Sequence, residues 1–183
     1  MKNILIISGH PDLKGDSFAN KIILADLAEQ LPSAVIDDLS ALYPDYRIDV
    51  PAEQDKLRHA DIIVLQFPIF WYSMPALLAK WMEDVFVRGF SHGSQGKALV
   101  GKKLVLSFTT GAPESAYDAA FPVDALTGRF VRTAGLTGMI YDGYVYTGGV
   151  SYADRTDPVR TADMTTAAHA HAKRLAEKIH SLA

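Results

Sequence analysis

Five short apolar runs alternate with segments of helical pattern, and this alternation constrains the fold of the chain more than any other feature. The apolar runs span residues 4–8, 34–38, 62–67, 104–109 and 139–146. Helical patterns span residues 17–31, 52–58, 75–87, roughly 125–134, and 159–182. Apolar strands that alternate with helices predict an α/β protein, a three-layer sandwich in which helices cover both faces of a mostly parallel sheet.

Five strands in 183 residues fit a single domain, residues 1–183, of the flavodoxin-like type with strand order 2-1-3-4-5. Right-handed crossovers then bring the loops after the first, third and fourth strands to one edge of the sheet. Ligands bind at that edge in open α/β folds. We therefore expect the chemistry of this chain in those three loops.

Composition narrows the functional classes. A net charge of −3 gives no electrostatic reason to expect nucleic acid as a partner. The absence of cysteine excludes thiolate catalysis and iron–sulfur ligation. The first apolar run is too short for a signal peptide, and no stretch approaches the roughly 18 apolar residues that a membrane span needs. We expect a cytoplasmic protein.

The loop after the third run is the most informative segment. It holds Phe70, Trp71 and Tyr72 between Pro68 and Pro75, and a proline suits the start of the helix that follows. We expect this rigid loop to form one wall of a slot for a flat heterocycle, with backbone N–H groups directed at the polar edge of the ring. The alternative is an aromatic plug that fills the core beneath a loop.

The loop after the first run suits a phosphate. It contains His10 and ends at Ser17, which is expected to cap the next helix. Free N–H groups at a helix start favour an anion, and the Ser17 hydroxyl and the His10 ring would add donors. The loop lacks both the G-x-G-x-x-G fingerprint and a Walker A lysine, so a nucleoside triphosphatase is not expected. The alternative is an ordinary capped loop.

The loop after the fourth run contains Thr109, Thr110, Gly111 and Ala112. Its hydroxyls and approachable N–H groups suit a ring edge that becomes negative on reduction. Thr-Thr-Gly by itself is also common in plain turns. A phosphate site, an aromatic wall and a donor-rich edge together match the parts of a flavin mononucleotide.

These segments resemble the NAD(P)H:quinone oxidoreductase family of flavodoxin-like proteins. They are most similar to its short bacterial members, including the ancillary flavoproteins of glutathione-gated potassium-efflux systems. The resemblance rests on the Gln-Phe-Pro…Trp-Tyr…Pro-x-x-Leu-x-x-Trp segment from Gln66 to Trp81, on His10-Pro11, on Ser17 to Asn20, and on Thr109-Thr110-Gly111.

The resemblance implies FMN as the cofactor, with FAD as the alternative, and NAD(P)H as the electron donor. It implies a quinone-like acceptor, a homodimer, and Tyr117 as the catalytic residue above the ring near the hydride path. The implied cofactor contacts are His10, Ser17, Phe18, Ala19, Asn20, Pro68, Ile69, Phe70, Trp71, Tyr72, Thr109, Thr110, Gly111 and Ala112.

The chain departs from the family pattern at two places. Ala112 stands where a second glycine is usual, and Phe121-Pro122 stands where some members have a histidine proposed to stabilise the reduced flavin. A mechanism that needs that histidine is not expected here. Hydride transfer does not need it, because the flavin carries out the chemistry.

Three functions stay open from the sequence. The first is an oxidoreductase that transfers two electrons by ping-pong hydride transfer. The second is a regulatory subunit that docks on a membrane potassium-efflux protein, which would place it at the inner face of the membrane. The third is a one-electron carrier of the flavodoxin type, but such carriers are strongly acidic and a net charge of −3 matches them poorly.

No metal site is expected, because none of the six histidines has metal-ligand spacing such as H-E-x-x-H. His169 and His171 would face different ways on a helix, and we expect both to be solvated. Ser107 has no recognisable His–Asp partners, so a hydrolase is not expected. The Gly-rich segment 90–97 is expected to be a mobile surface loop that borders the partner's pocket in a dimer.

Overall fold

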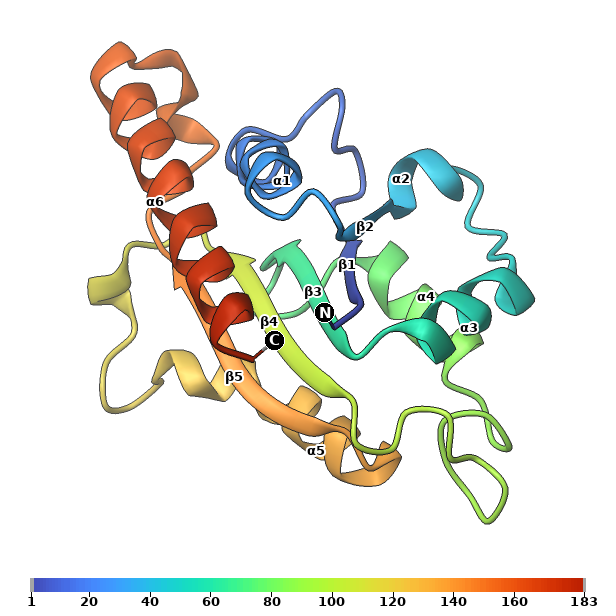
Figure 1. Cartoon of the computed structure of the whole chain (residues 1–183). Helices are drawn as coiled ribbons and strands as arrows, with labels where there is room; N and C mark the ends of the chain where they lie inside the picture. The colour runs from blue at the N-terminus through green and yellow to red at the C-terminus, as the bar shows by residue number, and fades with distance from the viewer. Residues whose placement is uncertain (1, 183) are drawn as a thin grey trace.

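The computed structural model describes residues 2–182 and contains a five-stranded parallel sheet (Figure 1). Its strands are β1 (Ile4–Ser8), β2 (Val35–Asp38), β3 (Ile62–Pro68), β4 (Lys103–Thr109) and β5 (Ile140–Thr147), in the order β2-β1-β3-β4-β5. This is the predicted flavodoxin-like fold with the predicted strand order. Ser8, Gln66 and Ser107 lie in register across the three central strands, so the loops after β1, β3 and β4 leave from one edge.

Helices cover both faces of the sheet (Figure 1). One face carries α1 (Ala19–Gln30) and α6 (Pro158–Leu182), and the other carries α2 (Leu39–Leu42), α3 (Val50–His59), α4 (Ala76–Val85) and α5 (Gly128–Thr137). Short 3-10 helices follow β4 and β5, namely η1 (Glu114–Ala116), η2 (Val123–Leu126) and η3 (Ala153–Thr156). The sequence pattern located the long helices within a few residues and missed α2.

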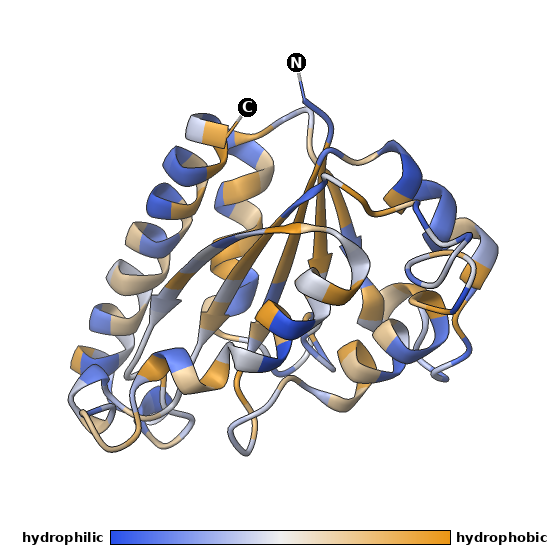
Figure 2. Cartoon of the chain, turned by 90° about the horizontal axis from the view of Figure 1, so that it is seen from below, coloured by the Kyte–Doolittle hydropathy of each residue, from blue (hydrophilic) through white to orange (hydrophobic). Residues whose placement is uncertain are grey.

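Alternate residues of the strands face two separate cores, as a sheet covered on both sides requires. Ile6 and Val64 pack toward α1 and α6, whereas Leu65 and Leu106 pack toward the other helices. Figure 2 shows the central strands as the most continuously hydrophobic elements, between helices whose outer surfaces are hydrophilic. Each such side chain contributes roughly 1.5–3 kcal/mol when fully buried. The site loops therefore leave from a rigid base.

A fully buried carboxylate, Glu53 at the start of α3, ties three helical segments together. Its oxygens accept hydrogen bonds from the Tyr43 hydroxyl, Trp81 Nε1 and Lys56 Nζ, each at 2.7 Å. Lys56 Nζ also lies 2.8 Å from the Asp37 carboxylate. Burial and the Glu53 carboxylate raise the pKa of Tyr43, which keeps that hydroxyl protonated as a donor.

The predicted surface loop 90–97 is anchored at its start. Phe90 and Ser91 are buried, and the Arg58 guanidinium lies 5.1 Å from the centroid of the Phe90 ring. The N–H of Ala98 donates to the Phe90 carbonyl at 3.1 Å. This segment therefore packs against the body of the protein at Phe90.

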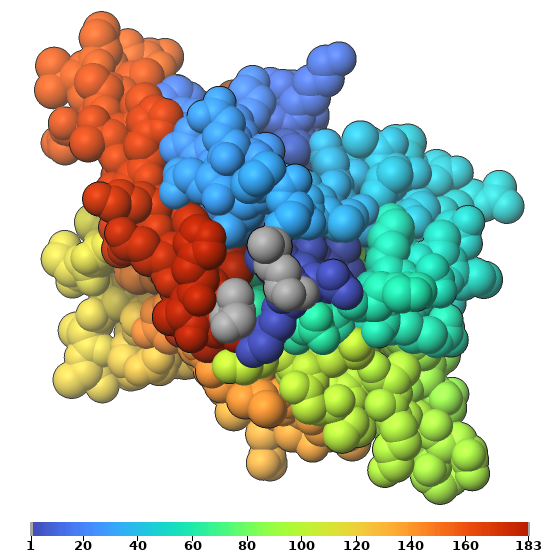
Figure 3. Space-filling view, in the orientation of Figure 1, coloured from blue at the N-terminus to red at the C-terminus, as the bar shows by residue number. Residues whose placement is uncertain are grey.

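Helices α1 and α6 pack side by side although most of the chain separates them (Figure 3). Ile23 and Leu27 of α1 belong to the same buried cluster as Leu175 and Ile179 of α6. This contact closes the core on that face of the sheet.

Candidate functional site

The loops after β1, β3 and β4 meet at the carboxyl edge of the sheet, as predicted, and enclose a cleft of about 310 Å³. A fourth segment, which follows β5, completes it. The lining residues are His10, Asp16, Phe18, Ala19, Asn20, Pro68, Ile69, Phe70, Thr109, Gly111, Val150, Tyr152 and Arg155. The cleft therefore brings together nine of the fourteen residues expected to contact a cofactor.

The start of α1 presents free backbone donors to this cleft. The amides of Phe18, Ala19 and Asn20 have no hydrogen-bond partner among residues 2–182, although Ala19 and Asn20 are buried. Ser17 is not the capping residue, because the helix begins at Ala19. Its Oγ accepts the N–H of Lys21 at 3.0 Å instead, so the hydroxyl serves the first turn of the helix. Three unpaired N–H groups at a helix start, two of them on buried residues, are suited to an anion.

His10 supplies a side-chain donor beside these amides. The ring is 4% exposed and lines the cleft, and its Nδ1 accepts the N–H of Asp12 at 3.1 Å. This hydrogen bond places the proton of the neutral ring on Nε2. Burial lowers the pKa of His10, and the carboxylates of Asp16 and Asp12 oppose that shift. The ring therefore offers Nε2–H as a neutral donor.

A buried polar layer lies beneath the cleft and holds two of the predicted contact residues. Asn20 Nδ2 donates to Thr109 Oγ1 at 3.1 Å, and Gln66 Nε2 donates to Asn20 Oδ1. The Asn20 side chain and the Thr109 hydroxyl are thus bonded to each other. Asn20 consequently offers its backbone amide to the cleft and not its side chain. Gln66 Oε1 and Ser8 Oγ are buried without a partner among the described residues.

The aromatic loop is a tight two-residue turn. Phe70 N–H donates to the Ser73 carbonyl at 2.9 Å, and Ser73 N–H donates back to Phe70 at 3.0 Å. The two central residues have left-handed φ angles, 49° at Trp71 and 61° at Tyr72. This pair corresponds to a type I′ turn, which normally contains Asn or Gly at these positions. The Phe70 amide is therefore not free, and only those of Trp71 and Tyr72 lack a partner among residues 2–182.

Exposure of the loop excludes the core-plug alternative. The Trp71 side chain is 94% exposed and that of Tyr72 is 65% exposed. The loop is held to β4 because Ile69 N–H donates to the Thr109 carbonyl at 2.7 Å. Left-handed residues of this size cost about 1–3 kcal/mol each and gather at functional sites.

The loop after β4 is braced by the segment that follows β5. Thr110 N–H donates to the Thr147 carbonyl at 3.1 Å, so this amide is not a free donor, contrary to the prediction. The Gly111 amide has no partner among the described residues. Thr110 Oγ1 donates to the Ala112 carbonyl at 2.8 Å and lies 3.2 Å from the Tyr146 hydroxyl. Tyr146 is therefore the donor of that pair, and burial raises its pKa.

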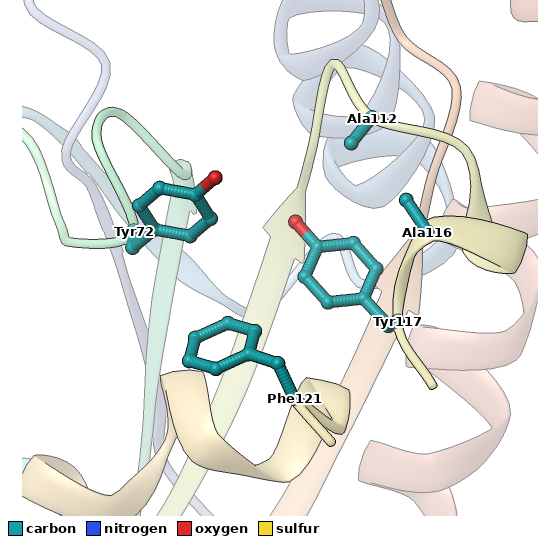
Figure 4. Close-up of a pocket in the computed structure, with 5 residues that line it drawn as sticks. All are labelled: Tyr72, Ala112, Ala116, Tyr117 and Phe121. Atoms are coloured by element: carbon teal, nitrogen blue, oxygen red, sulfur yellow. The ribbon is translucent and has the colours of Figure 1, made fainter. Parts of the chain in front are cut away.

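A second, apolar cavity of about 480 Å³ opens beside the cleft (Figure 4). Figure 4 shows the rings of Tyr72, Tyr117 and Phe121 around this hollow, with Ala112 and Ala116 beside them. The ring of Phe121 lies 5.6 Å from that of Tyr72 and 6.4 Å from that of Tyr117 between centroids.

A smaller hollow of about 230 Å³ connects the two cavities. It shares Ile69 and Gly111 with the cleft, and Tyr72, Ala112 and Tyr117 with the apolar cavity. The arrangement is a continuous slot with an anion site at one end and an aromatic cavity at the other. Tyr117 lies at the aromatic end.

Four lining residues were not predicted from the sequence, namely Asp16, Val150, Tyr152 and Arg155. Asp16 lies in the loop predicted to bind a phosphate, but no role was assigned to its side chain. The other three follow β5, which the strand-order argument did not place at the site. Tyr146 was also missed, because its hydroxyl reaches Thr110 only through the pairing of β5 with β4.

His171 contradicts the prediction that it is solvated, because it is fully buried between β4, β5 and α6. Its Nε2 lies 2.8 Å from Ser107 Oγ and its Nδ1 lies 2.9 Å from Thr147 Oγ1. Burial lowers the pKa of His171 to about 3, and the Arg174 charge adds to that shift. Ser107 thus has a histidine partner that the sequence did not reveal, but a buried pair without a carboxylate is no hydrolase site.

Within residues 2–182, the His, Asp and Glu side chains form no group of three that would hold a metal ion. None of the helices described combines the length and the apolar character that crossing a bilayer requires.

Comparison with known proteins places this geometry among related chains. The family model described as "Flavodoxin-like fold" matches residues 2–174. The glutathione-regulated potassium-efflux system ancillary protein KefG of Enterobacter sp. is 47% identical over 62% of this chain and 61% of its own length. The KefG of Pectobacterium atrosepticum is 44% identical over 74% of this chain and 75% of its own. The chain thus spans about three fifths to three quarters of these relatives.

Three solved structures share the fold closely. General stress protein 14 of Treponema denticola, in complex with FMN, has a TM-score of 0.77 and 30% identity over 92% of this chain and 99% of its own. An NADPH-quinone reductase from P. pentosaceus has a TM-score of 0.73 and 28% identity over 94% and 98%. A structure described as a thermophilic tryptophan halogenase from Streptomycin violaceusniger has a TM-score of 0.79 and 32% identity over 92% and 97%.

Proposed function

Because this chain belongs to the flavodoxin-like NAD(P)H:quinone oxidoreductase family, we propose that it binds FMN and transfers two electrons from NAD(P)H to a quinone or a similar acceptor. The observation that carries the proposal is the continuous slot, with unpaired amides and His10 at one end and an aromatic cavity at the other. The relative from Treponema denticola was solved with FMN, which supports the choice of cofactor.

The anion end fits a phosphate group. The amides of Phe18, Ala19 and Asn20 would donate to phosphate oxygens, and the Nε2–H of His10 would add a fourth donor. The positive end of the α1 dipole favours the same charge. Ser17 would contribute by holding the first turn of α1, since its hydroxyl already accepts the Lys21 amide.

The middle of the slot fits a flat ring. Pro68, Ile69 and Phe70 would line one side, while the unpaired amides of Trp71, Tyr72 and Gly111 would donate to its polar edge. When bound, FMN would supply the chemistry, accepting a hydride and passing two electrons on. Fixed amides stabilise negative charge at such an edge without reorganisation.

The aromatic cavity would receive the nicotinamide and the acceptor in turn. Its rings are contributed by Tyr72, Tyr117 and Phe121. A single apolar cavity beside the ring site accommodates one planar molecule at a time, which supports a ping-pong order. Tyr117 would orient that molecule, and no histidine is needed near Phe121.

We also propose that residues 1–183 form a single domain, that the protein works as a homodimer, and that it is cytoplasmic. The large exposure of Trp71 and Tyr72 beside the slot supports a second subunit at this edge, because large exposed aromatic rings are typical of interfaces.

A second candidate function follows from the relatives named as ancillary proteins of a glutathione-regulated potassium-efflux system. We propose that the chain docks on such a membrane protein at the inner face of the membrane, a role compatible with catalysis. Co-purification with the potassium-efflux protein from the same cells would support this role. Separate elution of two intact proteins would contradict it.

The catalytic proposal is tested by anaerobic titration of the purified protein with NADPH and, separately, NADH, while the visible absorbance is followed. We expect a flavin band that bleaches with one equivalent of donor and recovers on addition of a quinone. In Trp71→Ala, flavin retention or the rate of bleaching should fall at least several-fold. A colourless protein that takes up neither FMN nor FAD would rule the proposal out.

A further inference from the structure

An ion pair bridges the outer end of the cleft. Arg155 Nη1 donates to the backbone carbonyl of Asp16 at 2.7 Å and to its carboxylate at 3.0 Å. The Arg155 guanidinium also lies 4.4 Å from the centroid of the Tyr152 ring. This bridge joins the loop after β1 to the segment after β5, across 139 positions of the chain.

The bridge borders the anion site. Asp16, Tyr152 and Arg155 line the same cleft as His10 and the unpaired amides that begin at Phe18. His10 is more than nine-tenths buried, and its Nε2 has no partner among the described residues, so it can donate to a ligand in the cleft. The carboxylate of Asp16 and the guanidinium of Arg155 therefore border the cleft in which a phosphate would meet the α1 amides.

The two charges of the bridge have different consequences for a ligand. Only Nη1 of Arg155 is engaged by the described residues, so its remaining N–H groups are free to meet one phosphate beside the α1 amides. A second phosphate, linked to the first, would extend past the bridge. It would have to displace Arg155 from Asp16 and place its own negative charge against the Asp16 carboxylate, which is repulsive.

We propose that the Asp16–Arg155 bridge selects a flavin that ends in a single phosphate and rejects the dinucleotide form. This inference rests on the proposed flavin function and adds the residues that set its cofactor choice. The guanidinium of Arg155 lies against the face of the Tyr152 ring, and this cation–π contact helps to hold it in place.

The test compares riboflavin, FMN and FAD, which carry no phosphate, one phosphate and two phosphates. Dissociation constants are measured by the quenching of flavin fluorescence on binding to the apoprotein. We expect the wild-type protein to bind FMN at least about tenfold more tightly than FAD. Asp16→Asn keeps the shape and the acceptor but removes the charge, and should bring the two affinities about fivefold closer.

Arg155→Gln should weaken FMN binding about tenfold and leave riboflavin binding unchanged, because only the phosphate contact is lost. Arg160→Gln is the matched control, since Arg160 is a nearby arginine in the first turn of α6 that does not line the cleft, and the variant should alter none of the three affinities. Thermal unfolding of each apoprotein checks that the variants fold.

The outcomes separate this inference from the function on which it rests. Equal wild-type affinities for FMN and FAD, or an Asp16→Asn variant with an unchanged ratio, would overturn the bridge as selector and leave the flavin function standing. Loss of riboflavin and FMN binding to the same extent in Arg155→Gln would also overturn it. A wild-type protein that binds none of the three ligands would overturn the proposed function and the selection together.

Discussion

The left-handed turn of the aromatic loop predicts that Trp71 lowers the stability of the folded protein while it contributes to cofactor binding. Trp71 and Tyr72 have φ angles of 49° and 61°. This conformation costs roughly 1–2 kcal/mol for residues other than glycine, and asparagine tolerates it best among the rest. Because the Trp71 side chain is 94% exposed, its removal forfeits little burial. Trp71→Asn should therefore stabilise the apoprotein while it weakens FMN binding.

The matched comparison is Trp71→Asn against Trp71→Ala. Both variants remove the indole, but alanine retains the penalty for a positive φ and asparagine relieves much of it. We expect the free energy of unfolding to be about 1 kcal/mol higher for asparagine, which raises Tm by about 2–4 °C in a domain of this size. Both variants should lose FMN affinity by the same several-fold factor.

The assay is thermal and urea unfolding of the flavin-free proteins, followed by circular dichroism. Flavin must be absent, because a bound ligand stabilises the folded state and would mask the difference. If Trp71→Asn melts at or below the temperature of Trp71→Ala, the turn is not strained as described. If the asparagine variant also keeps wild-type FMN affinity, the role of the indole as a wall of the slot is refuted.

Two further predictions concern buried ionisable groups. Burial lowers the pKa of His171 to about 3, so the unfolded chain takes up a proton near pH 6.5 and the folded chain does not. The contribution of His171 to the free energy of unfolding is thus fully present above pH 6.5, and it falls by up to about 1.4 kcal/mol per pH unit as the pH drops from 6.5 to 3. The urea midpoints at pH 7 and pH 5.5 should therefore differ less in His171→Gln than in the wild-type protein. Glu53→Ala should lower the free energy of unfolding by roughly 3–5 kcal/mol, because it leaves the buried Trp81 and Tyr43 donors unpaired. Glu53→Gln keeps an acceptor oxygen and should cost less. Equal urea midpoints for Glu53→Ala and the wild-type protein would contradict the network.

The sequence predicted the architecture because local patterns determine it. Continuous apolar runs at β1, β3 and β4 indicated strands buried on both faces, and the parallel order followed from the helices between them. The convergence of three loops was likewise predictable, since it is a consequence of strand direction. Exposure of Trp71 excluded the aromatic plug.

The hydrogen-bond partners in the site were not predictable, because pairing across the chain decides them. The Phe70 amide is used within its own turn, and the Thr110 amide is used by Thr147, which pairs through β5. His171 was misread because the helical pattern shows which residues share a face but not what that face packs against. Arg155 reaches Asp16 only in the folded chain.

The packing of α1 against α6 has a consequence for the newly made chain. A ribosome releases α1 early and α6 last among the described elements, so the apolar face of α1 that includes Ile23 and Leu27 has no covering helix while the intervening residues are made. Such transiently exposed apolar surface is prone to aggregation, and chaperones protect it. Folding of the end of the slot that holds the α1 amides is thereby coupled to the synthesis of α6, because α1 is covered only when Leu175 and Ile179 have been made. Nascent chains truncated before α6 should accordingly be captured by chaperones, whereas chains that include it should escape.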